Sequence, residues 1–252
     1  MVVIDSKYKS ISAQLKSIPD VFGQGELIFN GRNQIRKFCI DGQVVVVKRY
    51  KRHDYLKSII YTFFRKNKAR RSYENAQELL KRGYDTPQPI AYWEDRRCCG
   101  LIRQVYYACE YTDAQPIRPR LIDQEPFDEP LATAYAHFVA SLHEHGVLHR
   151  DLNPTNVLYS RSEESYHFQL IDINRMRFFE GEVPKAECME NLTLFWWLTD
   201  VYRFVLREYA TIRRWTDEDI QQAIYVKERH DRRWIRRKNF TAIFKHKKLK
   251  TS

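Results

Sequence analysis

The pattern of hydrophobic and polar positions predicts a run of strands near the start of the chain. Three segments rich in β-branched or aromatic residues follow one another: Glu26–Asn30, Gln34–Ile40 and Gln43–Lys48. Asn-Gly at 30–31 and Asp-Gly at 41–42 stand at the two joins, and both dipeptides favour tight hairpin turns. Residues 1–22 mix polar and apolar positions, and no element is predicted there. We expect the three strands to form a small antiparallel sheet.

Helices and shorter strands are predicted further along the chain. Apolar residues recur every three or four positions between Lys68 and Lys81, which predicts a helix, and Gly83 is suited to end it. Two further strands, Ile90–Trp93 and Leu101–Tyr111, would complete a five-stranded sheet. The second half is predicted to contain a proline-rich loop over 116–130, a helix with the core face Leu131, Tyr135, Phe138 and Leu142, short strands Val157–Tyr159 and Phe168–Ile171, and a helix over about 191–209.

Composition narrows the class of protein and the chemistry of its partners. The chain has 252 residues, 43% of them hydrophobic and 14% aromatic, which predicts a folded protein with one large core or two small ones. The net charge of +11 predicts an anionic partner, either nucleic acid, acidic lipid or a phosphorylated glycan. The five cysteines have no metal-site spacing. No signal peptide or membrane-length apolar run is visible, so we expect a cytoplasmic protein.

One loop carries the strongest chemical signal. Residues 149–152 read His-Arg-Asp-Leu and Asn156 follows four positions later, which is the H-R-D-L-x-x-x-N catalytic-loop signature of protein-kinase-like folds. In that chemistry an aspartate accepts the proton of the attacking hydroxyl, and an amide oxygen five residues on reaches the metal that screens the phosphates. We therefore predict Asp151 as the catalytic base and Asn156 as a ligand of both nucleotide and metal.

The first half of the chain supplies candidates for holding phosphate. Four valines at 44–47 predict a fully buried strand that ends in Lys48, at the place of the phosphate-binding lysine in the kinase pattern V-A-I-K. Glu74, on the predicted helix, is the candidate ion-pair partner of Lys48, with Glu78 as the alternative. A G-x-G-x-x-G loop is absent, and the turn at 30–33 is predicted to cover the phosphates instead.

The remaining site residues follow from the order of the motifs. Asp172 comes directly after a predicted strand at the D-F-G position and is the candidate principal metal ligand. Asn174 replaces the glycine, and asparagine tolerates a left-handed backbone better than most residues do. Glu110 and Tyr111 lie in the predicted hinge, residues 109–112, whose backbone would meet the adenine edge. ATP and Mg²⁺ are the expected cofactors.

Together these residues resemble the lipopolysaccharide core kinases, the Kdo/heptose kinase family with a protein-kinase-like fold. The resemblance runs from about residue 26 to residue 210 and rests on Lys48, Glu74, the loop HRDLNPTN and the segment LIDINRMRF. It implies an α+β, two-lobed fold, with an antiparallel-sheet N-lobe over 1–113 and a mostly helical C-lobe over 114–252. It also implies an enzyme at the inner face of the cytoplasmic membrane that transfers the γ-phosphate of ATP to a sugar hydroxyl of an anionic, lipid-linked glycan.

The sequence leaves two alternative functions possible and the role of one segment, the basic tail, undecided. The same landmarks suit a RIO-type atypical protein kinase acting near RNA, and a pseudokinase scaffold would keep the fold without catalysis. Fewer than twenty residues separate Asp172 from the next predicted helix, and Asn153 stands where protein kinases carry a lysine, so a peptide acceptor is disfavoured. The basic tail, Lys227 to Lys250, is either an amphipathic segment for an anionic membrane or a final helix packed on the C-lobe.

Overall fold

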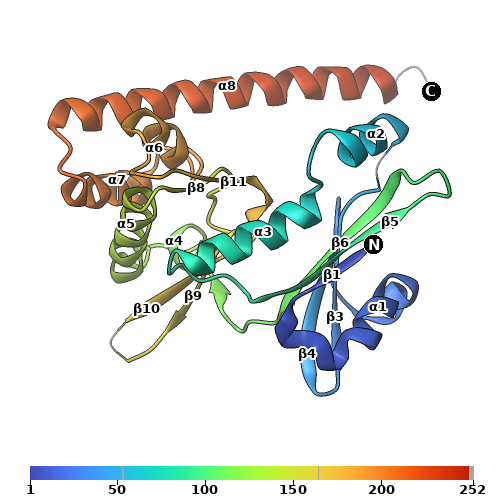
Figure 1. Ribbon diagram of the computed structural model, residues 1–252. Helices are drawn as coiled ribbons and strands as arrows, with labels where there is room; N and C mark the ends of the chain where they lie inside the picture. The colour runs from blue at the N-terminus through green and yellow to red at the C-terminus, as the bar shows by residue number, and fades with distance from the viewer. Residues whose placement is uncertain (53, 164, 250–252) are drawn as a thin grey trace. The chain divides into compact units, whose positions relative to one another are not determined.

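The computed structural model describes residues 1–52, 54–163 and 165–249, and the chain divides into two compact units. The sheet unit contains Met1–Gln115 and Gln169–Met176, and the helical unit contains Pro116–Phe168 and Arg177–Ser252 (Figure 1). The predicted boundary after residue 113 assigned the segment around Asp172 to the second lobe. In the structure residues 169–176 belong to the sheet unit instead.

The sheet unit is built on six antiparallel strands in the order β1-β5-β6-β4-β3-β2. The strands are β1 (Val2–Ile4), β2 (Glu26–Asn30), β3 (Gln34–Ile40), β4 (Gln43–Arg49), β5 (Pro89–Arg96) and β6 (Ile102–Glu110). The five predicted strands are present, but the predicted count of five is wrong. The additional strand, β1, pairs with β5 and is too short for its sequence to show a period.

Helices cover both faces of this sheet (Figure 1). They are η1 (Ser6–Ile11), α1 (Ser12–Val21), η2 (Phe22–Gln24), α2 (Tyr55–Phe63), α3 (Lys68–Lys81) and η3 (Ile173–Arg175). The predicted helix over Lys68–Lys81 is confirmed as α3. The Asn67 side chain caps its first turn by accepting a hydrogen bond from the Arg70 amide at 3.0 Å. Gly83 follows the helix with a φ of +81°.

Successive side chains of β4 point to opposite faces of the sheet, and the apolar core that β4 joins lies on one of these faces. Val45 and Val47 are fully buried in the core that includes α1. Val44 is exposed and Val46 half-buried, and both lie on the same face as Lys48. The prediction of a fully buried strand is therefore wrong, because only one face of this part of the sheet is covered by packed side chains.

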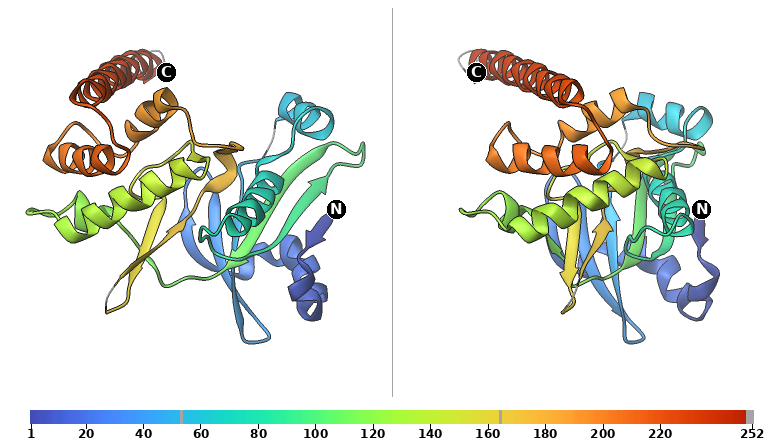
Figure 2. Two further views of the ribbon diagram at one scale, coloured as in Figure 1. Left: turned by 60° about the vertical axis from the view of Figure 1, so that its left-hand side comes forward. Right: turned by 90° about the vertical axis from the view of Figure 1, so that its left-hand side faces the viewer.

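The helical unit contains five helices and several short strands among its described residues. The helices are α4 (Arg118–Leu121), α5 (Glu129–Glu144), α6 (Lys185–Leu192), α7 (Asp200–Ile212) and α8 (Asp217–Leu249). The strands are β7 (Gln115–Pro116), β8 (Val147–His149), β9 (Val157–Arg161), β10 (Tyr166–Leu170) and β11 (Met176–Phe178), of which β7, β10 and β11 cross the unit boundaries. Strand β9 pairs with β7 and β10, and β8 pairs with β11. Helices α5 and α7 lie side by side (Figure 2).

One predicted helix, over about 191–209, is two helices in the structure. Helix α6 ends at Leu192 and α7 begins at Asp200. Two polar side chains near the break bind backbone carbonyl groups: Asn191 donates to the His149 oxygen at 2.9 Å and Thr193 to the Glu190 oxygen at 2.7 Å. Such side-chain bonds compete with continued helix formation.

The basic tail begins inside the helical unit. The Lys227 ammonium is buried and donates to the Thr193 carbonyl at 3.1 Å and to the Asp231 carboxylate at 2.7 Å. The Trp234 ring packs edge-on against Trp197 at 4.8 Å between centroids. The first turns of this segment are therefore part of the packed fold.

The contacts of Lys227 and Trp234 concern only the beginning of the predicted tail. The side chains from Phe240 onward, and all of Lys250, lie outside the described residues. Across the described residues, no helix combines the length and the apolar character needed to span a bilayer.

Gly146 connects α5 to β8 and has almost no space for a side chain. Its φ is +69°, and a Cβ atom there would lie 2.3 Å from the Gly181 carbonyl oxygen and 2.6 Å from that of Phe179. The Phe179 amide also donates to the Gly146 carbonyl at 2.8 Å. Gly83 has a similar φ of +81°, but a Cβ atom there would meet nothing within 4 Å.

These two glycines form a matched pair for a stability test. We expect Gly83→Ala to lower the free energy of unfolding by about 1 kcal/mol, the cost of a left-handed alanine. We expect Gly146→Ala to cost about 3 kcal/mol or more, because backbone atoms would also have to move. Urea unfolding of both variants measures the difference. Equal losses would show that the close approach at Gly146 does not constrain the fold.

Candidate active site

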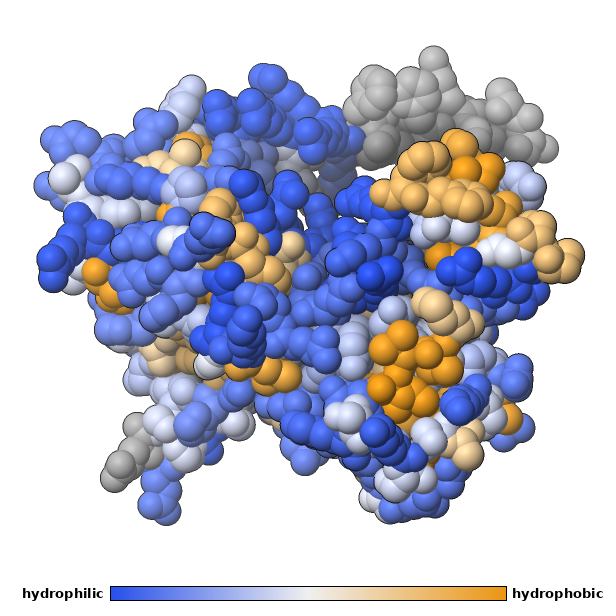
Figure 3. Space-filling view, in the orientation of Figure 1, coloured by the Kyte–Doolittle hydropathy of each residue, from blue (hydrophilic) through white to orange (hydrophobic). Residues whose placement is uncertain are grey.

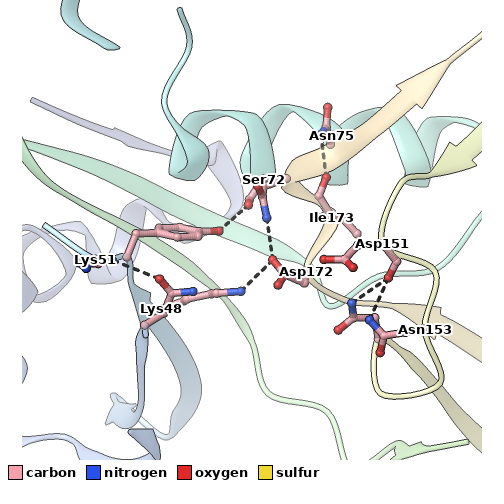
Figure 4. A network of polar contacts seen from close by, with 12 residues as sticks. Lys48, Lys51, Ser72, Asn75, Asp151, Asn153, Asp172 and Ile173 are labelled. Carbon is pink, nitrogen blue, oxygen red and sulfur yellow. Dashed lines mark hydrogen bonds and ion pairs between the residues drawn. The ribbon is translucent and has the colours of Figure 1, made fainter. Parts of the chain in front are cut away.

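Lys48 and Asp172, separated by 124 positions in the sequence, form an ion pair in the sheet unit (Figure 4). The Lys48 Nζ atom lies 2.9 Å from Asp172 Oδ1, and the side chains are 16% and 31% exposed. Lys48 comes from β4, and Asp172 lies two positions after the end of β10. The structure therefore brings together the predicted phosphate-binding lysine and the predicted metal ligand.

The segment that carries Asp172 is held against the sheet unit by three hydrogen bonds. The Leu170 amide donates to the Asp85 carbonyl at 2.9 Å, and the Thr86 hydroxyl donates to the Leu170 carbonyl at 2.7 Å. On the other side of Asp172, the Asn75 side chain on α3 donates to the Ile173 carbonyl at 2.7 Å. These contacts fix the backbone on both sides of the carboxylate.

Asp172 itself adopts the left-handed conformation, with φ 54° and ψ 41°. The left-handed position of this turn was expected at Asn174, and that expectation is wrong because Asn174 lies in η3. The Asn174 side chain instead donates to Asp172 Oδ1 at 2.6 Å. A glycine in its place would remove this contact, so the asparagine orients the carboxylate.

The ammonium of Lys48 lies over an aromatic ring as well as beside the carboxylate. Its Nζ atom is 5.3 Å from the centroid of Tyr50, whose hydroxyl is 2.7 Å from the Ser72 hydroxyl on α3. Burial lowers the pKa of Lys48, but the attraction of Tyr50 and Asp172 outweighs it and the net shift is upward. Since burial also raises the pKa of Tyr50, the ring is neutral near pH 7 and its face attracts the cation.

Further cations surround this pair. The Lys68 Nζ atom lies 6.0 Å from the Tyr50 centroid, and burial and the charge of Arg32 lower the pKa of Lys68. Burial likewise lowers the pKa of Arg71, whose Nε atom is buried without a hydrogen-bond partner among the described residues. This part of the sheet unit is therefore electropositive and suited to attract a polyanion.

The predicted ion pair between Lys48 and Glu74 is wrong in this structure. Glu74 binds Lys66 at 2.8 Å and Arg70 at 2.9 Å, and the alternative, Glu78, binds Arg82 at 2.7 Å. The reason is the rotation of α3 about its axis. Its buried face includes Ser72, and position 74 lies about 200° around the helix from position 72.

The predicted hinge residues lie at the end of β6. The Glu110 carboxylate accepts hydrogen bonds from the Tyr8 hydroxyl at 3.0 Å and from Gln43 Nε2 at 3.1 Å. The backbone N–H groups of Glu110 and Tyr111 donate to carbonyl groups within the sheet unit. An adenine edge here would have to meet other backbone groups than these two amides, so the nucleotide-binding role of both residues stays a prediction.

The loop after β8 is organised in the helical unit around one carbonyl group. The Asp151 carbonyl accepts hydrogen bonds from the Asn153 amide at 2.8 Å, from Asn153 Nδ2 at 3.2 Å and from Asn156 Nδ2 at 2.9 Å (Figure 4). The Asp151 amide in turn donates to His149 Nδ1 at 3.1 Å. Asp151 and Asn156 are thus brought together, and the amide of Asn156 is oriented with its nitrogen toward the loop.

A buried polar chain supports the start of this loop. His143 on α5 contacts the Tyr209 hydroxyl through Nδ1 at 2.9 Å and Asn191 Oδ1 through Nε2 at 3.0 Å. Asn191 then donates to the His149 carbonyl. The carbonyl acceptor on Nε2 assigns the proton to that nitrogen, so the ring is neutral and accepts from Tyr209.

The predicted metal ligands have suitable chemistry. Carboxylate and amide oxygens are the hard donors that Mg²⁺ prefers. The Asn156 nitrogen is engaged by the Asp151 carbonyl, which orients the amide oxygen as the donor atom. Both hydrogen bonds described to Asp172 end at Oδ1. The side-chain chemistry of Asn156, in the helical unit, and of Asp172, in the sheet unit, is therefore suited to magnesium, and the metal-binding role of each residue stays a prediction.

Sequence reasoning did not predict the contacts that several residues make in these networks: Tyr50, Ser72, Asn75, Asn153, Asn174, Asn191 and His143. Ser72 and Asn75 had a usable signal, because with Lys68 they form a polar stripe at helical spacing on a helix whose neighbouring stripe is apolar. Asn153 also had a usable signal, because the side chain of an asparagine two residues after a loop aspartate commonly forms hydrogen bonds with nearby backbone groups.

A family model and two curated proteins match parts of this sequence. The sequence model of the Lipopolysaccharide kinase (Kdo/WaaP) family matches residues 34–226, more than half of the chain. Over 80 residues the chain is 31% identical to Calcium-dependent protein kinase 24 of Arabidopsis thaliana, and over 79 residues it is 34% identical to Calcium-dependent protein kinase 9 of Oryza sativa subsp. japonica. Each match covers 30% of this chain and only 14% of the relative.

Solved structures are similar over most of the chain. WaaP in complex with acyl carrier protein is similar over 92% of this chain and 98% of that chain, with a TM-score of 0.63 and 18% identity. The Rio2 kinase-ADP/Mg²⁺-phosphoaspartate complex from Chaetomium thermophilum is similar over 88% of this chain and 77% of that chain, with a TM-score of 0.47 and 15% identity. The first likeness confirms the predicted α+β, protein-kinase-like fold.

The buried histidine generates a prediction about pH. Burial lowers the pKa of His143 to about 4, so its neutral form is favoured in the folded state. The stabilisation is complete well above pH 6.5, where an unfolded histidine is also neutral, and it is lost progressively as the pH falls through 6.5 toward 4. The free energy of unfolding should fall by on the order of 3 kcal/mol from this group.

We expect the loss to be smaller in His143→Gln, because glutamine does not titrate. Urea unfolding at pH 6.5 and pH 4.5 compares the two proteins, and NMR titration of the ring follows His143 directly. An identical pH dependence in both proteins, with a ring pKa near 6.5, would contradict the assignment of a neutral buried histidine.

Proposed function

The chain belongs to the lipopolysaccharide kinase (Kdo/WaaP) family, and on this premise we propose that it transfers the γ-phosphate of ATP to a sugar hydroxyl of a lipid-linked glycan. The observation that carries the proposal is the ion pair between Lys48 and Asp172 at 2.9 Å. A lysine that binds phosphate and an aspartate that binds metal are the two charged groups that phosphoryl transfer from a nucleotide requires.

Lys48 has the role of the phosphate-binding cation. Its raised pKa keeps the ammonium charged, and the Tyr50 ring restrains its position. Val44 and Val46 lie on the same face of β4 and leave apolar surface uncovered beside it, which suits an adenine ring. Lys68 and Arg71 add positive charge next to Lys48, so the sheet unit can hold several phosphate oxygens.

Asp151 has the role of general base toward the acceptor hydroxyl. Its backbone is fixed by the three hydrogen bonds to its carbonyl and by the contact of its amide with His149. Positioned proton transfer of this kind contributes roughly 10²–10⁴-fold in rate. Asn156 and Asp172 would hold magnesium, which when bound neutralises the charge of the transferring phosphate.

The acceptor is proposed to be a glycan hydroxyl because the chain has little structure for presenting a peptide. After η3 the chain continues directly through β11 and reaches α6 at Lys185. Positive charge on the protein suits an acceptor that carries phosphate or carboxylate groups. The acceptor's lipid anchor would place the enzyme at the inner face of the cytoplasmic membrane.

Transfer of label from ATP tests both the proposed function and the proposed role of Asp151 as general base. We expect the purified protein with Mg²⁺ and γ-labelled ATP to label lipopolysaccharide from a core-truncated strain, and Asp151→Asn to lose at least 10²-fold of that activity while it still binds ATP. The amide keeps the shape of the side chain but cannot accept the proton.

The other outcomes assign the rival functions. Label in proteins and none in glycolipid would favour an atypical protein kinase. Failure of the unmodified protein to bind Mg·ATP in a thermal-shift titration would favour a pseudokinase scaffold. Normal transfer by Asp151→Asn would remove Asp151 from the role of base.

A further inference from the structure

Helix α2 (Tyr55–Phe63) presents its apolar side chains to solvent. Five large apolar residues in and directly after this helix are between 39% and 81% exposed: Tyr55, Leu56, Ile60, Phe63 and Phe64. Folding normally buries such residues, and one exposed leucine needs no explanation. Five of them on ten consecutive positions form a patch, and such patches mark interaction surfaces. The patch is hydrophobic (orange) over α2 at the upper right of Figure 3.

The helix is attached to the sheet unit by its polar side. Ser58 is fully buried, and the Thr62 hydroxyl accepts a hydrogen bond from the Ile102 amide of β6 at 2.9 Å and donates to the Ser58 carbonyl at 2.6 Å. Ser58 and Thr62 are four residues apart and share one face of the helix. An ordinary surface helix buries its apolar face and exposes its polar one, so α2 is oriented the opposite way.

Basic residues surround this apolar face. Positions 51–66 contain five cations, Lys51, Arg52, Lys57, Arg65 and Lys66, and a single acidic residue, Asp54. All five cations are exposed. Lys57 is paired with Asp54 and Lys66 with Glu74. Within the part of the chain that the structure describes, Lys51, Arg52 and Arg65 have no acidic partner.

We propose that α2 and its basic flanks, residues 51–52 and 54–66, dock on a bilayer that contains anionic lipid. An interfacial helix inserts leucine and aromatic side chains at the boundary of headgroups and acyl chains, while neighbouring lysine and arginine side chains meet anionic headgroups. The residues of α2 have this division between apolar and basic chemistry. Docking requires neither nucleotide nor catalysis, so the inference goes beyond the proposed phosphate transfer and can be tested without it.

Vesicle sedimentation with the full chain tests the surface. We expect binding to vesicles of equal parts phosphatidylglycerol and phosphatidylcholine, and binding weaker by about tenfold or more to phosphatidylcholine alone. Leu56→Glu with Phe63→Glu should weaken binding to the anionic vesicles by about tenfold or more, because two carboxylates would enter the apolar layer. Lys51→Gln, Arg52→Gln and Arg65→Gln together should weaken it and reduce its dependence on salt.

A matched control uses exposed apolar residues elsewhere in the same unit. Leu27 and Ile28 on β2 are 47% and 49% exposed, and Leu27→Glu with Ile28→Glu makes the same chemical change outside α2. We expect this control to bind vesicles as the unmodified protein does. Thermal unfolding of every variant should match the unmodified protein, since the replaced side chains are exposed, and a variant that unfolds early is replaced by Leu56→Ser with Phe63→Ser.

The proposal would be overturned by a failure of the unmodified protein to bind anionic vesicles, by equal binding to neutral vesicles, or by full binding of a folded α2 variant. A loss of binding in the β2 control equal to that in the α2 variant would also overturn it.

The kinase proposal is judged separately, by transfer to a deacylated core oligosaccharide. The α2 variant should phosphorylate that soluble acceptor normally, and absence of transfer by the unmodified protein would reject the kinase proposal while the vesicle result still stands.

Discussion

The contact between Lys48 and Asp172 is the constraint on which the sheet unit depends. It joins the middle of the six-stranded sheet to a segment that comes more than a hundred residues later. The Lys48 charge is only partly exposed to water, so the carboxylate must stay beside it or the ammonium would lose its main compensation. Hydrogen bonds from Thr86, Asn75 and Asn174 to this segment help to keep that carboxylate in place.

The same pair explains how a nucleotide would be accepted. In this structure the ammonium of Lys48 is bonded to Asp172 Oδ1, one of the oxygens that would bind a metal. A nucleotide phosphate offers the lysine a second anionic partner, and a divalent cation offers the aspartate a second cationic one. Exchange of partners then requires small side-chain movements, because both backbones are already fixed. Glu74, engaged with Lys66 and Arg70, is not needed to orient the lysine.

Much of this fold is predictable from the sequence because its signals are local. Strands β2 to β4 and helix α3 have clear periods and end at turn dipeptides or at a suitable capping residue, and the catalytic-loop motif is contiguous. The partner of Lys48 is not local, because it depends on the rotation of α3 against the sheet, and tertiary packing decides that rotation. The left-handed backbone expected at Asn174 lies at Asp172 instead, and the side-chain bond from Asn174 to Asp172 was not predicted.

Helix α2 shows a different limit of sequence reasoning. Its apolar residues would be expected inside a core, yet Ser58 and Thr62 are the residues that face β6. A hydrophobic period predicts which residues share a face, but it does not predict whether protein or another apolar phase covers that face. The order of motifs gave a reliable fold and family, while the environment of individual side chains required the structure.

The most direct test of the central claim is isothermal titration calorimetry of ATP, with and without Mg²⁺, on the unmodified protein and on Asp172→Asn. The amide keeps the shape of the side chain and removes its charge. If Lys48 and Asp172 exchange their mutual contact for phosphate and metal, Mg²⁺ will strengthen ATP binding to the unmodified protein. It will not strengthen binding to Asp172→Asn, which will still bind metal-free ATP through Lys48. An equal effect of Mg²⁺ on both proteins would contradict the account.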